Sequence, residues 1–180
     1  MESNPIFIVG MPASGKSTFG RALARRLGRR FVDLDAYIEN RFHTTVRALF
    51  ADRGERAFRR LEALMLREVG EFEDVVVATG GGAPCHSDNM EYMSSRGLTV
   101  WLEAGEERLM QRIRQRPDKR PLLAGLEGEA LRRRLRQMAE ARNPFYAMAA
   151  VKTDSERLET RSQIDAAIEG FLGRMREPFS

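Results

Sequence analysis

The sequence predicts an α/β fold in which a parallel β-sheet is covered by helices on both faces. Two observations support this prediction. Short apolar runs, typical of buried strands, alternate with segments whose apolar residues recur at helical spacing. A glycine-rich loop also joins the first apolar run to the first helical segment, as expected in a sheet built from βαβ units.

The expected strands are short and partly β-branched. They are Ile-Phe-Ile-Val at 6–9, the shorter Phe-Val-Asp at 31–33, Val-Val-Val-Ala at 75–78 and Leu-Thr-Val-Trp-Leu at 98–102. Helical periodicity falls between and after them, at 18–27, 45–50, 58–69, 106–113 and 162–175. Strands that alternate with helices in this way pair in parallel.

The composition fits one globular domain. A chain of 180 residues can bury one substantial core but hardly two, so we expect a single domain over 1–180. No stretch approaches the ~20 apolar residues that span a bilayer, so we expect no membrane partner. The first residues lack the basic and apolar regions of a signal peptide, and Cys85 is the only cysteine; both features favour the cytoplasm.

The net charge is +4, and arginine supplies most of the positive charge because only Lys16, Lys119 and Lys152 are lysines. The planar guanidinium favours contacts with phosphate and carboxylate groups, so anionic substrates are plausible and nucleic acid is the competing interpretation. Runs such as 132–136 lie in helical segments beside leucines and acids, which is typical of a solvated helix face. We therefore expect no nucleic-acid partner.

The loop after the first strand matches the pattern G-x-x-x-x-G-K-[ST] with Gly10, Gly15, Lys16 and Ser17. Such a loop curls so that backbone N–H groups point at phosphates, while the lysine reaches the β- and γ-phosphates and the hydroxyl binds magnesium. The alternative is an ordinary glycine turn. The flanking strand and helix favour ATP or GTP, with these expected nucleotide contacts: Ala13, Ser14, Gly15, Lys16, Ser17 and Thr18.

Two acids, Asp33 and Asp35, follow the second expected strand, at the edge where ligands collect in open α/β sheets. In an extended chain, residues two apart point to the same side, so both carboxylates can face one crevice. One could hold the water shell of magnesium and the other could accept a proton from an attacking hydroxyl. In the alternative, Asp35 caps a helix that opens at Ala36, and Asp33 is merely exposed.

Three consecutive glycines, 80–82, follow the third expected strand. Their conformational cost suggests a place where the backbone approaches a ligand or another segment closely, although a tight turn is the simpler interpretation. Upstream, Arg59 and Glu62 share one helix face at i, i+3, where a solvated ion pair would stabilise the helix by only about 0.2–0.5 kcal/mol.

The phosphate loop, "DLD" at 33–35, "FRRLE" at 58–62, "ATGGG" at 78–82 and "RPLL" at 120–123 occur in the order and at the separations found in shikimate kinases. The chain resembles that family over 6–151. The resemblance implies a three-layer P-loop kinase fold like that of nucleoside monophosphate kinases: a five-stranded parallel sheet flanked by helices, a substrate-binding region at 33–62 and a mobile lid at 116–128. It also implies a monomer.

The implied reaction transfers the γ-phosphoryl group of ATP to the 3-hydroxyl of shikimate, a step of chorismate and aromatic amino acid biosynthesis. By position, Asp35 resembles the acid that binds the shikimate hydroxyls and acts as the base. Arg59 and Arg142 resemble the two arginines that bind the shikimate carboxylate. The glycine turn below the substrate ring corresponds to Gly80, Gly81 and Gly82.

The resemblance also implies roles on the nucleotide side. Lys16 and the lid arginine, Arg120, are expected to neutralise charge on the transferring phosphate. Ser17 would bind Mg²⁺ directly, and Asp33 would hold the water shell of that ion.

Arg112 resembles the arginine that flanks adenine, and Arg114 is an alternative because the segment before "RPLL" is slightly longer than in some relatives. A kinase of the same architecture with another acceptor, such as gluconate or a nucleotide, is the nearest alternative function. A nucleic-acid-binding or regulatory protein that kept nucleotide binding without catalysis is the second alternative.

Overall fold

The computed structural model describes residues 3–115, 123 and 125–176 of the chain. Within these residues, five parallel strands form one sheet in the order β2-β3-β1-β4-β5. The strands are β1 (Ile6–Val9), β2 (Arg30–Asp33), β3 (Val75–Ala78), β4 (Leu98–Glu103) and β5 (Val151–Asp154). The predicted α/β class and its parallel sheet are confirmed, and the four runs expected from the sequence are strands.

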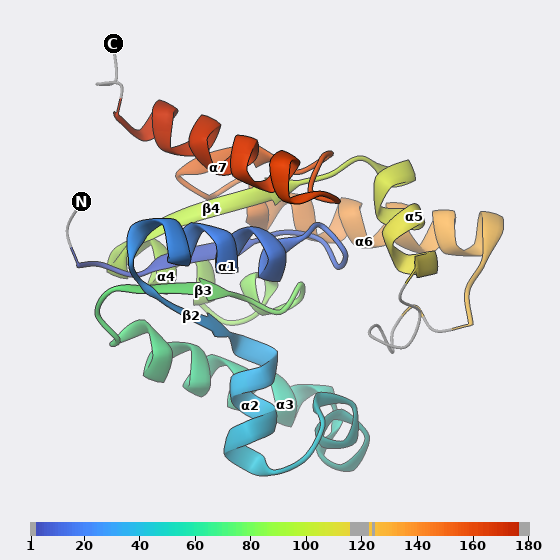
Figure 1. Cartoon of the computed structure of the whole chain (residues 1–180). Coiled ribbons are helices and arrows are strands. Elements are labelled where there is room, and N and C mark those ends of the chain that lie inside the picture. Colours follow the sequence, from blue (N-terminus) through green and yellow to red (C-terminus); the bar gives the residue numbers. More distant parts are fainter. Residues whose placement is uncertain (1–2, 116–122, 124, 177–180) are drawn as a thin grey trace.

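Helices cover both faces of this sheet, as Figure 1 shows. They are α1 (Lys16–Leu27), α2 (Leu34–Phe42), α3 (Val46–Gly70), α4 (Asn89–Arg96), α5 (Glu106–Gln115), α6 (Gly128–Tyr146) and α7 (Arg161–Arg176), with a short 3-10 turn, η1 (Ala83–Cys85). None of the helices in the described part of the chain is long and apolar enough to cross a membrane.

Strand β1 shows how the layers form. Its four residues are all buried and alternate between two cores: Ile6 and Ile8 pack with α1 and α7, whereas Phe7 and Val9 face the core on the side of α3 and α6. A strand buried on both faces reads as a continuous apolar run, which explains the sequence pattern. The carboxyl ends of the strands therefore meet at one edge, between the two helical layers.

One local prediction was wrong. The alternation expected through Asp33 and Asp35 stops, because α2 begins at Leu34; Asp33 is its N-cap and its Oδ1 accepts a hydrogen bond from Ala36 N at 3.4 Å. The alternative in which Asp35 caps this helix is therefore also wrong. The separate helices expected at 45–50 and 58–69 are confirmed: they lie on either side of Gly54, whose non-helical backbone interrupts the segment labelled α3.

The interruption in α3 has a local cause. Gly54 adopts φ 75° and ψ 166°, a conformation that residues with a side chain avoid. The break lies between Phe50 and Phe58, whose ring centroids are 4.9 Å apart. Both rings line the cleft that opens at the carboxyl edge of the sheet.

Candidate active site

The glycine-rich loop lies between β1 and α1, as the motif requires. Gly10 adopts φ 147° and Gly15 φ 94°, both in the region that favours glycine. A Cβ atom on Gly10 would lie 2.4 Å from the Leu102 carbonyl oxygen. Helix α1 begins at Lys16, so the positive end of its dipole and its unpaired N–H groups face the loop. The local structure is that of an anion-binding loop.

Polar side chains connect this loop to its surroundings. The Lys16 ammonium lies across the loop and donates hydrogen bonds to the carbonyl oxygens of Gly10 and Met11, both at 2.8 Å. Ser17 Oγ donates to Asp33 Oδ2 at 2.6 Å. A hydroxyl and a carboxylate are the hard oxygen ligands that Mg²⁺ prefers, so this pair fits a magnesium site. Among the described residues, no cluster of three or more His, Cys, Asp or Glu side chains could hold a metal by itself.

The loop forms one wall of a cleft of about 640 Å³ at the carboxyl edge of the sheet. The cleft brings together most of the site residues expected from the sequence: Ala13, Gly15, Lys16, Ser17, Thr18, Asp33, Asp35, Arg59, Gly80, Gly81, Gly82 and Arg142. Ser14 is fully buried and does not line it. Arg120 and the expected lid positions 116–122 and 124 lie outside the described residues.

Asp35 carries an unusual proton affinity. Burial raises the pKa of its carboxyl from 3.8 to about 7, and the negative charges of Glu62 and Asp33 add to this effect, while Lys16 partly offsets it. A carboxyl group that titrates near neutral pH is suited to accept a proton from a hydroxyl. Asp35 therefore has the chemistry of a general base and lies in the same cleft as Lys16.

Arg59 is held in place in the same cleft as Asp35. Its side chain is 12% exposed, and its Nη1 donates to Glu62 Oε2 at 2.7 Å. The guanidinium also lies over the rings of Phe50 and Phe58, 5.5 Å from each centroid. Glu62 is 1% exposed, and burial raises its pKa although Arg59 and Arg142 act in the opposite direction.

The interpretation of Arg59 and Glu62 as a solvated pair is therefore wrong: this is a buried ion pair that fixes one cation at the cleft. Sequence reasoning missed the importance of Glu62. The i, i+3 spacing of Arg59 and Glu62 did not signal this burial, because the same spacing occurs on exposed and on buried helix faces.

The three glycines after β3 provide space for charged side chains. A Cβ on Gly80 would lie 3.0 Å from both Asp35 Oδ1 and Glu62 Oε1, and one on Gly81 would lie 3.1 Å from Arg142 Nη1. A Cβ on Gly82 would be only 2.5 Å from Arg59 Nη2. None of the three has a positive φ. Packing against the cleft, more than backbone conformation, accounts for this run of glycines.

Helix α6 completes the wall opposite α3. Tyr146 is fully buried, and its hydroxyl donates to the Gly81 carbonyl oxygen at 2.5 Å. Burial raises the pKa of this phenol, so it remains a neutral donor. Arg142 lies one helical turn before Tyr146 and lines the cleft. Sequence reasoning missed Tyr146, which fixes the glycine turn against α6.

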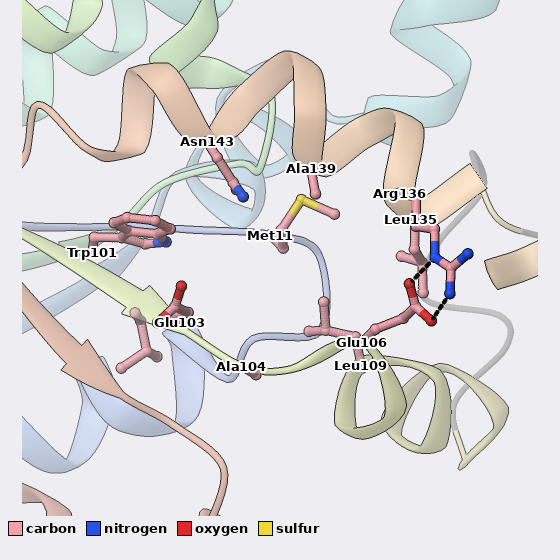
Figure 2. A pocket seen from close by; sticks show the side chains of 11 residues that line it. Met11, Trp101, Glu103, Ala104, Glu106, Leu109, Leu135, Arg136, Ala139 and Asn143 are labelled. Atoms are coloured by element: carbon pink, nitrogen blue, oxygen red, sulfur yellow. Dashed lines mark hydrogen bonds and ion pairs between the residues drawn. The ribbon is translucent and has the colours of Figure 1, made fainter. Parts of the chain in front are cut away.

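A second, smaller cavity of about 190 Å³ lies between β4, α5 and α6 (Figure 2). Apolar side chains such as Met11, Leu109 and Leu135 form much of its lining. The acid drawn at its edge, Glu106, is paired with Arg136, whose Nε donates to Oε2 at 2.7 Å. The acids that line this cavity are ion-paired, Glu103 with Lys152 and Glu106 with Arg132 and Arg136, and we assign no chemistry to it.

The two arginines considered for an adenine contact differ in position. Arg112 is 12% exposed and lies against the outer side of the phosphate loop, whereas Arg114 is exposed on α5. Neither lines the cleft.

Comparisons with known proteins show which family this chain resembles. The family model described as Shikimate kinase matches residues 12–172. A shikimate kinase of Bacteroides fragilis is 50% identical over 164 residues, covering 91% of this chain and 92% of the relative. One from Parabacteroides distasonis is 48% identical over 159 residues, covering 88% and 92%.

Solved structures give the same result. The crystal structure of a shikimate kinase from Bacteroides thetaiotaomicron superposes with a TM-score of 0.93 at 45% identity, covering 97% of this chain and 99% of the other. A shikimate kinase from Acinetobacter baumannii, in complex with shikimate, gives 0.85 at 32% identity, covering 98% and 96%. A gluconokinase from Sinorhizobium meliloti shares the fold, with a TM-score of 0.59 at 18% identity over 96% and 95% of the two chains.

Proposed function

We propose that this chain, which belongs to the shikimate kinase family, transfers the γ-phosphoryl group of ATP to the 3-hydroxyl of shikimate. The products are shikimate 3-phosphate and ADP, and the reaction serves chorismate and aromatic amino acid biosynthesis. One observation carries the proposal: a phosphate loop shares its cleft with Arg59, Arg142 and Asp35. Shikimate carries one carboxylate and three hydroxyls, which two arginines and a basic carboxylate complement.

On the donor side, the N–H groups from Gly15 to Thr18 would hold the phosphates of ATP. Lys16, which bonds to loop carbonyls in this structure, would turn to the β- and γ-phosphates. Ser17 would ligate Mg²⁺ and Asp33 would hold the water shell of that ion, consistent with the 2.6 Å bond between them. The ion supplies positive charge that neutralises the phosphate oxygens.

On the acceptor side, Arg59 and Arg142 would bind the shikimate carboxylate, and backbone groups of the turn from Gly80 to Gly82 would contact the ring hydroxyls. Asp35 would accept the proton of the 3-hydroxyl as its oxygen forms the new bond to phosphorus. The bond between that phosphorus and the β–γ bridging oxygen breaks, and ADP leaves. Positioning and charge neutralisation supply most of the rate enhancement in such a transfer.

The remaining assignments are part of the same proposal. The chain would act as one domain, with acceptor-binding residues in 33–62 and a lid at 116–128 whose arginine is Arg120. Arg112 would flank adenine. We further propose a cytoplasmic monomer that takes only small-molecule substrates, supported by the family membership and by the single cysteine, Cys85.

A coupled enzyme assay for ADP release tests whether shikimate is the phosphoryl acceptor. Purified protein is incubated with ATP and Mg²⁺ and with shikimate, gluconate, nucleoside monophosphates or no acceptor. Release that depends on shikimate is expected. ATP binding without shikimate-dependent turnover would leave the phosphate loop assigned and overturn the acceptor; turnover on gluconate would identify the other kinase that shares this fold.

A further inference from the structure

The phosphate loop holds a strained residue. Ala13 adopts φ 69°, in the left-handed region, although it is not a glycine. This conformation costs a residue with a Cβ atom about 1–2 kcal/mol. Two residues later, Gly15 also has a positive φ of 94°. A loop that alternates left- and right-handed residues turns successive N–H groups into an anion-binding concavity, so the strain belongs to the binding conformation. Other contacts must offset it.

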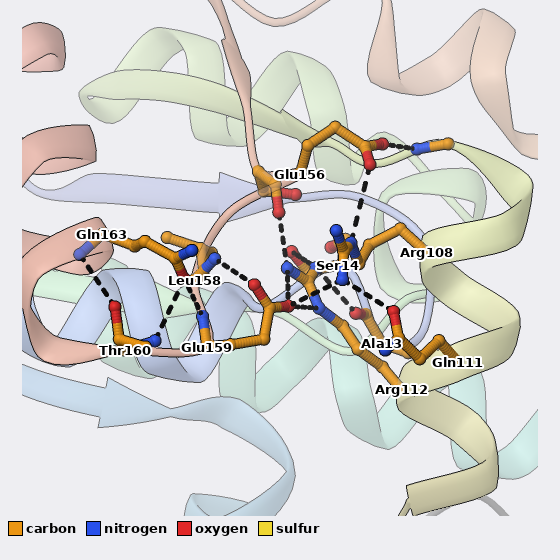
Figure 3. A network of polar contacts seen from close by, with 12 residues as sticks. Ala13, Ser14, Arg108, Gln111, Arg112, Glu156, Leu158, Glu159, Thr160 and Gln163 are labelled. Atoms are coloured by element: carbon orange, nitrogen blue, oxygen red, sulfur yellow. Dashed lines mark hydrogen bonds and ion pairs between the residues drawn. The ribbon is translucent and has the colours of Figure 1, made fainter.

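Arg112 of α5 contacts the loop at this point, although it does not line the cleft (Figure 3). Its Nη1 donates to two neighbouring carbonyl oxygens, at 3.4 Å to Ala13 and 3.3 Å to Ser14. Nη1 carries two hydrogens, so it can donate to both carbonyl oxygens at once. The guanidinium therefore fixes the orientation of the two peptide groups that follow Ala13 and Ser14.

The segment between β5 and α7 holds Arg112 in place. Its Nη2 donates to the Ser155 carbonyl oxygen at 2.6 Å and to Glu159 Oε1 at 2.8 Å, and its Nε donates to the same Glu159 oxygen at 3.0 Å. The other oxygen of Glu159 accepts from Leu158 N at 3.0 Å. The Leu158 side chain also packs on the loop, where a Cβ on Gly15 would lie 2.7 Å from its Cδ1.

The contacts of Arg112 with the loop carbonyls also set the direction of the Gly15 N–H, because of the geometry of a trans peptide. The carbonyl and the N–H of one peptide plane point in opposite directions. When Arg112 draws the Ser14 carbonyl outward, the N–H of Gly15 is turned to the other side. The Ser14 N–H is already used in a turn to Met11 O at 3.1 Å, whereas the Gly15 N–H has no acceptor among the described residues.

We propose that Arg112, oriented by Glu159, is a positioning residue for the phosphate loop, which directs the Gly15 N–H at the bound phosphates and offsets the strain at Ala13. This inference rests on the proposed nucleotide-binding function and deepens it. It gives Arg112 a role that is independent of any contact with the base. It also gives a role to Glu159, which touches no part of the cleft.

The two roles of Arg112 respond to different ligands. A residue that only flanks adenine cannot affect the binding of an anion that lacks the adenine base. A residue that shapes the loop affects every polyphosphate to the same degree, because it acts on the N–H groups. Inorganic tripolyphosphate, which carries the phosphates alone, therefore separates the two roles.

The experiment measures binding of ATP and of tripolyphosphate by isothermal titration calorimetry to the wild type, Glu159→Gln and Arg112→Lys. We expect both variants to bind both ligands about tenfold more weakly, by a similar factor, since each variant weakens the charge-assisted bonds by which Glu159 orients Arg112. The KM for ATP should rise with it, while the KM for shikimate should stay within about twofold.

Glu156→Gln is the matched control. Glu156 lies in the same segment and accepts from Gly105 N, but contacts neither Arg112 nor the phosphate loop. Its tripolyphosphate affinity should remain within about twofold of the wild type. Equal weakening in this control would mean that any loosening of the segment suffices and would overturn the role of Glu159.

Two further results are decisive. Unchanged tripolyphosphate affinity in Glu159→Gln and Arg112→Lys, whatever happens to ATP, would overturn the inference. If the wild type bound neither ligand, the proposed function would fail first. Circular dichroism verifies that each variant is folded, and Arg112→Lys keeps the test open if Glu159→Gln does not fold.

Discussion

The two halves of the cleft are built from different parts of the chain. On the donor side, the fixed points are backbone groups: Lys16 and Arg112 both donate to carbonyl oxygens of one short loop. On the acceptor side, charged side chains meet one another, and glycines give them room. A phosphate is held by a local backbone shape, whereas a small hydroxy acid is recognised by side chains that only the complete fold brings together.

The halves also differ in their electrostatics. The acceptor side buries two carboxyl groups, Asp35 and Glu62, whose pKa values are raised chiefly by loss of solvent. On the donor side, Lys16 and Arg112 satisfy their charges with carbonyls and Glu159. Burying charge is costly, so the acceptor side should combine the largest effects on catalysis with a measurable cost in stability.

The largest effect is expected for Asp35→Asn. The amide keeps the shape of the side chain but cannot accept the proton of the attacking hydroxyl, so kcat should fall about 10²–10⁴-fold. ATP affinity should change by less than about threefold, because the donor side is untouched. Steady-state kinetics and a nucleotide-binding titration measure the two quantities. Near-normal turnover would show that Asp35 is not the base.

Asp35 should also make the stability of the folded protein depend on pH. An unfolded carboxyl group releases its proton near pH 3.8, and the folded Asp35 near pH 7. Between these values the folded state holds more protons, so its stability falls as the pH rises from about 4 to 7, by at most about 4 kcal/mol.

Asp35→Asn removes this dependence. The variant should therefore unfold at a higher temperature than the wild type at pH 8, and the difference should shrink at pH 5, where Asp35 is protonated. Thermal denaturation at both pH values measures it. A variant that is less stable than the wild type at pH 8 would mean that Asp35 is stabilised as a carboxylate.

The next largest effect should change the KM for shikimate and leave the KM for ATP nearly unchanged. Arg142→Ala removes one of the two cations placed for the shikimate carboxylate, and loss of a charge-assisted contact should raise the KM for shikimate about 10–100-fold. The KM for ATP should remain within about threefold, since no hydrogen bond or ion pair within the described part of the chain joins Arg142 to the phosphate loop. A rise in the KM for ATP alone would place Arg142 on the donor side.

The contrast between the halves also explains what the sequence could predict. The phosphate loop is contiguous, and its demands on glycine, lysine and serine are local, so Gly10, Gly15 and Lys16 predict it directly. The buried strands are equally readable from their apolar runs. Asp33 was harder: it ends β2 and also caps α2, and only the start of α2 at Leu34 shows the second role.

Burial could not be predicted for the Arg59–Glu62 pair, because i, i+3 spacing is the same on a solvent-exposed and on a buried helix face. Its environment depends on the glycine turn after β3 and on the kink at Gly54, which lie elsewhere in the chain. The contact of Arg112 with Glu159 spans 47 residues, and no local pattern signals it. Edge strand β5 is partly exposed and lacks a continuous apolar run.

The smallest effect on the KM for shikimate is expected when the space beside Arg59 is filled. Gly82→Ala adds a Cβ that would lie 2.5 Å from Arg59 Nη2, in a backbone conformation of φ −89° and ψ −18° that alanine adopts without strain. Arg59 cannot turn aside freely, because Glu62 and two aromatic rings hold it. We therefore expect a rise of about fivefold to tenfold in the KM for shikimate and no change for ATP.

Gly173→Ala in α7 is the matched control, because a Cβ there meets no atom within 4 Å and the helical backbone suits alanine. It should leave both KM values unchanged and stabilise the protein by about 0.5–1 kcal/mol. If Gly82→Ala left the KM for shikimate at the wild-type value, Arg59 would be free to move, and the acceptor half would owe its specificity to an adaptable side chain instead of a fixed ion pair.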